Sequence, residues 1–170
     1  STLRDAVIAG LSLNIFNRHA DRVRMANLAQ MVNVIQSLVL TRGGEMVVTP
    51  TWHVFDLYKV HQGATSIPVD IGTPDYVEGA SRMPQVSVSA SRDAGGALHL
   101  SIVNLHPDRA APVAATIAGT TGRTATAETL TAARIDTRIE FGKADPFVPA
   151  RLDGVRLADG RLALTVPARS

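Results

Sequence analysis

The stretch His19-Ala-Asp-Arg-Val-Arg-Met-Ala-Asn-Leu-Ala-Gln-Met-Val-Asn-Val-Ile35 is the most informative part of this chain. Its centre, Val23–Ala29, is short and mostly apolar, as expected of a parallel strand that is covered on both faces. Two neutral amides, Gln30 and Asn33, follow at the point where the strand should end. In barrels of alternating strands and helices, side chains just past the carboxyl ends of the strands face the active site. The stretch therefore predicts a barrel strand with polar side chains at its exit.

Helical patterns flank this predicted strand on both sides. Thr2 and Asp5 have the spacing of a capping box, and apolar residues follow at helical intervals. Thr49 precedes Pro50, a residue that suits the first position of a second helix. A helix, a buried strand and another helix form one unit of an α/β architecture, so residues 1–64 are predicted to be α/β.

The pattern changes over residues 65–170 to short alternating segments separated by turn signals, which is typical of an all-β domain. Val86–Ala90 and Leu98–Ile102 both alternate apolar with polar side chains, and Asp93–Gly96 between them predicts a hairpin turn. Asp159–Gly160 predicts a second hairpin near the end of the chain. We expect these segments to form a β-sandwich.

Length and composition limit the possible functions. The chain has 170 residues, whereas a complete barrel needs about 250, so only part of one fits. The formal net charge is +2 and the charges are scattered, which argues against nucleic acid as a partner. No apolar run could span a membrane. The absence of cysteine and of a signal-peptide pattern favours the cytoplasm and leaves a periplasmic or secreted location open.

A second motif, Thr49-Pro-Thr-Trp-His-Val-Phe-Asp-Leu-Tyr-Lys-Val-His-Gln62, extends the first. Together the two motifs resemble the last-strand region of the family 51 α-L-arabinofuranosidases. The resemblance implies a catalytic (β/α)8 TIM barrel followed by a jelly-roll-like β-sandwich. Residues 1–64 would supply the last helix, strand and closing helix of the barrel. Residues 65–170 would form the sandwich without its final strand, because relatives continue past Ser170.

The resemblance also assigns a role to Gln30. It matches the barrel-end glutamine that hydrogen-bonds the arabinofuranosyl ring next to the scissile bond. An amide suits this task, since it can donate to one sugar oxygen and accept from another. Spacing alone would favour a glutamine that only satisfies loop backbone, and the motif reverses that preference. Asn27, Asn33 and Trp52 are expected to support the site by hydrogen bonding or packing.

The catalytic carboxylates that the family needs are not found in the motifs. A retaining glycosidase uses two carboxyl groups about 5–5.5 Å apart. None of the glutamates matches the catalytic positions, so we assign no catalytic residue and expect both outside this chain. The histidines show no metal-binding spacing, and we expect no metal and no cofactor. The glutamates are Glu45, Glu78, Glu128 and Glu140.

The sequence thus predicts the C-terminal part of a retaining exo-acting α-L-arabinofuranosidase. Such an enzyme removes terminal non-reducing arabinofuranosyl residues from arabinoxylan, arabinan and arabino-oligosaccharides. The expected partners are these saccharides, the N-terminal barrel portion and further copies in a homo-oligomer, with no nucleic acid and no membrane. One alternative is a family member that acts on β-glucan or a xyloside. Another is a non-catalytic carbohydrate-binding or structural sandwich, although the only aromatics predicted in it are Tyr76, Phe141 and Phe147.

Overall fold

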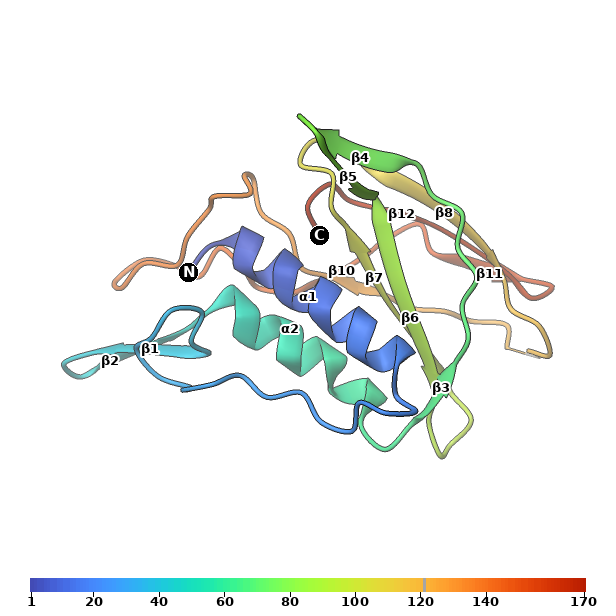
Figure 1. The fold of residues 1–170 in the computed structure, drawn as a ribbon, viewed down its shortest axis with the longest axis horizontal. Helices are drawn as coiled ribbons and strands as arrows, with labels where there is room; N and C mark the ends of the chain where they lie inside the picture. Colours follow the sequence, from blue (N-terminus) through green and yellow to red (C-terminus); the bar gives the residue numbers. More distant parts are fainter. Residues whose placement is uncertain (121) are drawn as a thin grey trace.

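The computed structural model describes residues 1–120 and 122–170, which form three layers (Figure 1). Two helices cover one face of a three-stranded antiparallel sheet, and a second three-stranded sheet lies on the opposite face. The all-β part therefore has the two packed sheets expected of a sandwich. Within the described residues, no helix is both long and apolar enough to cross a membrane.

The elements are mostly short. The helical layer holds α1 (Leu3–Arg18), α2 (Pro50–Tyr58) and the 3-10 turn η1 (Lys59–His61). The first sheet has the order β3-β6-β7, with β3 at Thr65–Ile67, β6 at Val86–Arg92 and β7 at Leu98–Asn104. The second has the order β11-β12-β8, with β11 at Arg156–Ala158, β12 at Arg161–Val166 and β8 at Ala111–Thr116. The remaining strands form the pairs β1 (Val39–Arg42) with β2 (Glu45–Val48), β4 (Asp75–Glu78) with β5 (Ser81–Pro84), and β9 (Glu128–Thr129) with β10 (Ala150–Arg151).

Both hairpin turns predicted from the sequence are confirmed. Asp93–Gly96 joins β6 to β7, and Asp159–Gly160 joins β11 to β12. Asp159 and Gly160 both have positive φ (49° and 72°), as a tight two-residue turn requires. The helix start at Thr49 is confirmed as well, since the Thr49 hydroxyl accepts from the Trp52 N–H at the N-terminus of α2.

Residues 23–29, predicted as a parallel barrel strand, form no strand in this structure. Residues 23–29 have no regular secondary structure and run back past the helices towards β1 (Figure 1). A strand requires neighbours that satisfy its backbone N–H and C=O groups. No strand of the described residues pairs with this segment. An apolar segment does not form a strand when no neighbouring strand is present to pair with it.

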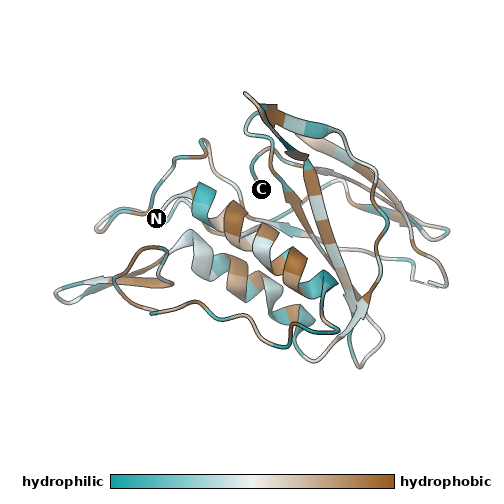
Figure 2. Cartoon of the chain, in the orientation of Figure 1, coloured by the Kyte–Doolittle hydropathy of each residue, from teal (hydrophilic) through white to brown (hydrophobic). Residues whose placement is uncertain are grey.

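A serine-rich face of β6 holds the helical layer to the first sheet. Apolar and polar residues alternate along this strand (Figure 2). The hydroxyls of Ser87 and Ser89 face α1, where both bond Asn14. Asn14 of α1 is 0% exposed, and its Nδ2 donates to the Ser87 carbonyl (3.1 Å). Its Oδ1 accepts from the hydroxyls of Ser89 (2.7 Å) and Tyr58 (2.9 Å). Burial raises the pKa of Tyr58, so its hydroxyl stays a neutral donor.

The apolar core of the helical layer is completed by the late part of the chain. Leu3 of α1 and Val54 of α2 pack in one cluster with Leu130, Ile139 and Phe147. The Leu3 and Arg4 N–H groups also donate to carbonyls of the loop that follows Leu130. The first and last thirds of the chain therefore share one core. A separate cluster between the sheets consists of Val86, Val88, Ala111 and Val166.

The substitution Asn14→Ala should strongly lower the melting temperature measured by calorimetry. It removes a buried acceptor that two hydroxyls share, at a cost of about 2–4 kcal/mol. Ser12→Ala is the matched control, because the Ser12 hydroxyl donates only to the Ile8 carbonyl of its own helix. Equal melting temperatures for the two variants would contradict this role of Asn14.

Candidate functional site

The candidate site is the loop 19–38, which joins α1 to β1. Gln30, Asn33 and Gln36 all have left-handed backbones within it, with φ of 57°, 56° and 60°. Left-handed φ is uncommon for residues other than glycine and persists where surrounding contacts impose it. Such residues cluster at binding and catalytic sites. The loop therefore has a backbone conformation typical of a functional segment.

Gln30 lies exposed on this loop. Among the described residues its side chain makes no hydrogen bond, so both ends of the amide are free to bind a ligand. Asn27 is exposed as well, and Trp52 is exposed at the start of α2 with its ring edge-on to His53 (centroids 5.1 Å apart). No hydrogen bond within the described part of the chain joins Asn27 or Trp52 to Gln30, and their supporting role stays a prediction.

The side chain of Asn33 is hydrogen-bonded to a neighbouring element. Its Nδ2 donates to the Thr41 hydroxyl and its Oδ1 accepts from the Thr41 N–H, both at 2.8 Å. Thr41 belongs to the hairpin β1–β2, which the sequence analysis did not predict. The missed signal is Gly43-Gly44 between two short β-prone runs, a two-residue turn of the kind that closes hairpins.

The base of this hairpin is anchored on the buried start of α2. The Thr49 hydroxyl donates to the Ser37 carbonyl (2.7 Å), and the Thr49 N–H donates to the Leu38 carbonyl (2.9 Å). Ser37 and Thr49 are both buried, at 1% and 0% exposure. A rigid base of this kind fixes where the candidate loop meets the helical layer.

Exposed apolar side chains lie on the candidate loop itself and on the neighbouring hairpin. Ile35 is 94% exposed and Met25 is 75% exposed. Large exposed apolar groups close together mark contact surfaces for other polypeptide. The loop therefore presents the Gln30 amide together with apolar side chains that this chain leaves exposed. The other exposed members are Met31, Val32 and Met46.

The glutamates of the chain do not form a catalytic pair. Glu45 is bound to Arg42 (2.9 Å), and Glu140 is bound to Lys143 (2.7 Å). The Lys143 hydrogen bond lowers the pKa of Glu140, which is opposite to the shift that a general acid needs. Glu78 accepts from the Tyr76 hydroxyl. Glu45, Glu78 and Glu140 therefore lack the apolar surroundings of a glycosidase acid.

The aromatic residues of the sandwich do not form an exposed row. Phe147 is fully buried, and the Arg42 guanidinium covers the Phe141 ring at 4.6 Å. Tyr76 packs edge-on against His106 with ring centroids 5.4 Å apart. Among the described residues there is thus no flat aromatic platform of the kind on which sugars stack.

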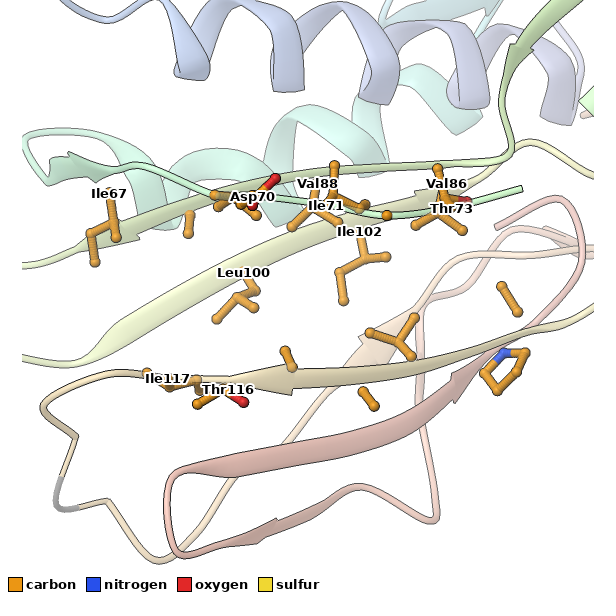
Figure 3. A pocket seen from close by; sticks show the side chains of 18 of the residues that line it. Ile67, Asp70, Ile71, Thr73, Val86, Val88, Leu100, Ile102, Thr116 and Ile117 are labelled. Carbon is orange, nitrogen blue, oxygen red and sulfur yellow. The ribbon is translucent and has the colours of Figure 1, made fainter. Parts of the chain in front are cut away.

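A cavity of about 790 Å³ lies between the two sheets (Figure 3). Its walls are mainly aliphatic, with Val86, Val88, Leu100 and Ile102 pointing inwards (Figure 3). Sugar sites need several converging polar groups, so this cavity does not suit a saccharide.

The further strand predicted beyond the end of the chain stays a prediction. β12 already pairs with β11 and β8, so such a strand would add at an outer sheet edge.

His61 of η1 is held between two serines of the first sheet. Its Nδ1 lies 2.7 Å from the Ser91 hydroxyl, and its Nε2 lies 2.8 Å from the Ser101 hydroxyl. A neutral imidazole has one donor and one acceptor, so both nitrogens can be satisfied here. Burial lowers the pKa of His61, and the nearby His99 lowers it further. His61 thus docks the end of the helical layer as a neutral side chain.

Acidification through about pH 6.5 should lower the melting temperature. The unfolded His61 binds a proton near that pH whereas the folded one resists it, so stability falls as pH decreases. His61→Gln keeps an amide that can bond both serines but does not titrate, and it should flatten this part of the profile. The pKa of Asp93 is lowered mainly by its hydrogen bond to His99, so its contribution to folding stability is lost only at lower pH. An unchanged slope in His61→Gln would assign the effect to other groups.

Comparison with known proteins gives consistent matches along the whole chain. The family model for the α-L-arabinofuranosidase C-terminal domain matches residues 1–170. An intracellular exo-α-L-arabinofuranosidase of Bacteroides ovatus is 40% identical over 171 residues, covering 100% of this chain and 33% of that protein. A probable α-L-arabinofuranosidase C of Aspergillus niger is 30% identical over 155 residues, covering 86% of this chain and 30% of its own length.

Solved structures agree with these matches. The crystal structure of the GH51 arabinofuranosidase from Xanthomonas axonopodis pv. citri superposes with a TM-score of 0.96 at 39% identity. The superposition covers 99% of this chain and 34% of that one. A GH51 α-L-arabinofuranosidase of Thermotoga petrophila shares the fold at 23% identity, with a TM-score of 0.86. The chain therefore spans about a third of the length of the relatives it matches.

Proposed function

The chain belongs to the α-L-arabinofuranosidase C-terminal domain family, and from this membership we propose that it is part of a retaining exo-acting α-L-arabinofuranosidase. The parent enzyme hydrolyses terminal non-reducing α-L-arabinofuranosyl residues of arabinoxylan, arabinan and arabino-oligosaccharides. The observation that carries the proposal is 40% identity, over the full length of this chain, to a protein named for this activity. The two catalytic carboxylates belong to the part of the enzyme outside this chain.

In this proposal residues 1–64 close the catalytic barrel and residues 65–170 form the sandwich. Val23–Ala29 pairs as a strand once the preceding part of the polypeptide supplies neighbouring strands. Two observations support this assignment. The segment runs back past α1 and α2 (Figure 1), as a strand between two barrel helices does. The exposed Met25 and Ile35 also need a covering partner, which the barrel provides.

Gln30 contacts the sugar in this enzyme. Its amide is exposed and free of other hydrogen bonds within the described residues, and it lies on a loop with a left-handed backbone. The amide binds the arabinofuranosyl ring by donating to one ring substituent and accepting from another. Asn27 and Trp52 support the same site from the loop and from the start of α2.

Compartment and assembly follow the same proposal. The Bacteroides ovatus relative is named as intracellular, which supports a cytoplasmic location for this enzyme too. Ile8, Ile15 and Phe16 are exposed on the outer side of α1 and offer apolar surface to the barrel and to further copies in a homo-oligomer.

The full-length polypeptide should hydrolyse an aryl α-L-arabinofuranoside. Proton NMR of the first product should show arabinose with retained anomeric configuration, because double displacement inverts the centre twice. Aryl β-glucoside and aryl β-xyloside are the comparison substrates. Hydrolysis of either of these without activity on the arabinofuranoside would contradict the proposal and favour the alternative specificity.

Gln30→Ala in the full-length enzyme should reduce kcat/KM by about 5- to 150-fold, as expected for the loss of a neutral hydrogen bond at the transition state. The melting temperature should hardly change, since Gln30 is exposed and both side chains carry the Cβ that is strained at positive φ. Gln36→Ala is the matched control on the same loop. A large drop in melting temperature with unchanged kcat/KM would make Gln30 a structural residue.

A further inference from the structure

We infer that Asn33 and Thr41 form a positioning pair that holds the Gln30 loop in its substrate-binding conformation. This inference rests on the proposed function and adds the hairpin β1–β2 to the substrate-binding apparatus. Neither residue touches the sugar in this account. Both act through the backbone that carries Gln30.

The contact between the pair is reciprocal. The Asn33 amide donates to the Thr41 hydroxyl and accepts from the Thr41 N–H, each at 2.8 Å. The backbone adds two further bonds, from the Val39 N–H to the Met31 carbonyl (3.0 Å) and from the Asn33 N–H to the Val39 carbonyl (3.1 Å). The loop is therefore fastened to β1 directly after Gln30, by main-chain and side-chain bonds together.

The strand to which the loop is fastened is itself fixed. Val39 pairs with Val48 of β2. Thr49, which follows Val48, is the N-cap of α2. The buried bond from Thr49 to the Ser37 carbonyl closes the base of the hairpin. A continuous series of hydrogen bonds thus connects the helical layer to Asn33.

Gln30 needs this support because its own side chain supplies none within the described residues. Gln30 and Asn33 both have a left-handed backbone, which costs free energy unless surrounding contacts impose it. Asparagine tolerates this conformation better than most residues. A loop released from β1 would relax, and a displacement of about 1 Å at a binding group can reduce kcat/KM by up to about 100-fold.

The exposure of the pair points to positioning rather than to stability. Asn33 and Thr41 are both exposed, and exposed neutral hydrogen bonds add little to the free energy of unfolding. Loss of the pair should therefore affect the loop while the fold stays intact. The effect should appear mainly in KM, since a smaller fraction of molecules would present Gln30 correctly.

The test uses the full-length enzyme and an aryl α-L-arabinofuranoside. Asn33→Gly keeps the left-handed backbone free of strain but removes the amide, and Thr41→Val removes the hydroxyl. Each should raise KM by about 3- to 30-fold, as expected for the loss of one or two neutral hydrogen bonds, with a smaller change in kcat. Thr41→Ser keeps the hydroxyl and should retain wild-type kinetics. Gln36→Gly is the matched control for a glycine placed at a left-handed position of the same loop.

The double variant Asn33→Gly with Gln30→Ala separates positioning from an independent effect. If Asn33 acts through Gln30, the double variant should have the kcat/KM of Gln30→Ala alone. Multiplicative losses, or equal losses in Gln36→Gly, would overturn the inference and leave the proposed function intact. A wild-type enzyme without arabinofuranosidase activity would overturn both.

Discussion

The buried hydrogen bonds of Asn14 are the interaction on which the arrangement of this chain depends. They join one helix, a tyrosine of the other helix and the central strand of the first sheet at a single side chain. Buried polar groups that satisfy one another specify a unique docking geometry, whereas an apolar contact would tolerate sliding. The helical layer therefore has one position on the sheet. That position also fixes where the loop after α1 and the hairpin before α2 begin.

The position of the candidate site is fixed by the two helices. α1 leads into the loop that carries Gln30, and α2 begins at the residue that anchors the hairpin next to that loop. The first sheet of the sandwich holds α1 through the β6 serines, and α1 leads into the loop. Remote scaffolding of this kind is common where a short polar segment must face a substrate accurately.

Local sequence patterns predicted much of this fold, and the failures share one physical cause. The turns at Asp93–Gly96 and Asp159–Gly160 depend on neighbouring residues and were correct. The strand at Val23–Ala29 depends on a pairing partner that its own residues cannot supply. The serines of β6 were predicted as the polar side of a strand, but the sequence could not show that a helix would bury them. Gln30 was predicted through motif resemblance, and the bonds between Asn33 and Thr41 were missed because they form only once the hairpin is folded.

The serine face of β6 also affects how such enzymes can be recombined. In many multidomain proteins the contact between domains is apolar and tolerates sequence differences, so one domain can be exchanged for that of a distant relative. Here the two sides are matched atom by atom, with Asn14, Asn17 and Arg18 all bonded to β6 serines. A chimera cut between residues 64 and 65 would combine a helix from one parent with a strand from another and leave buried donors without acceptors. In a chimera, α1 and β6 should therefore come from the same parent, although the two lie far apart along the chain.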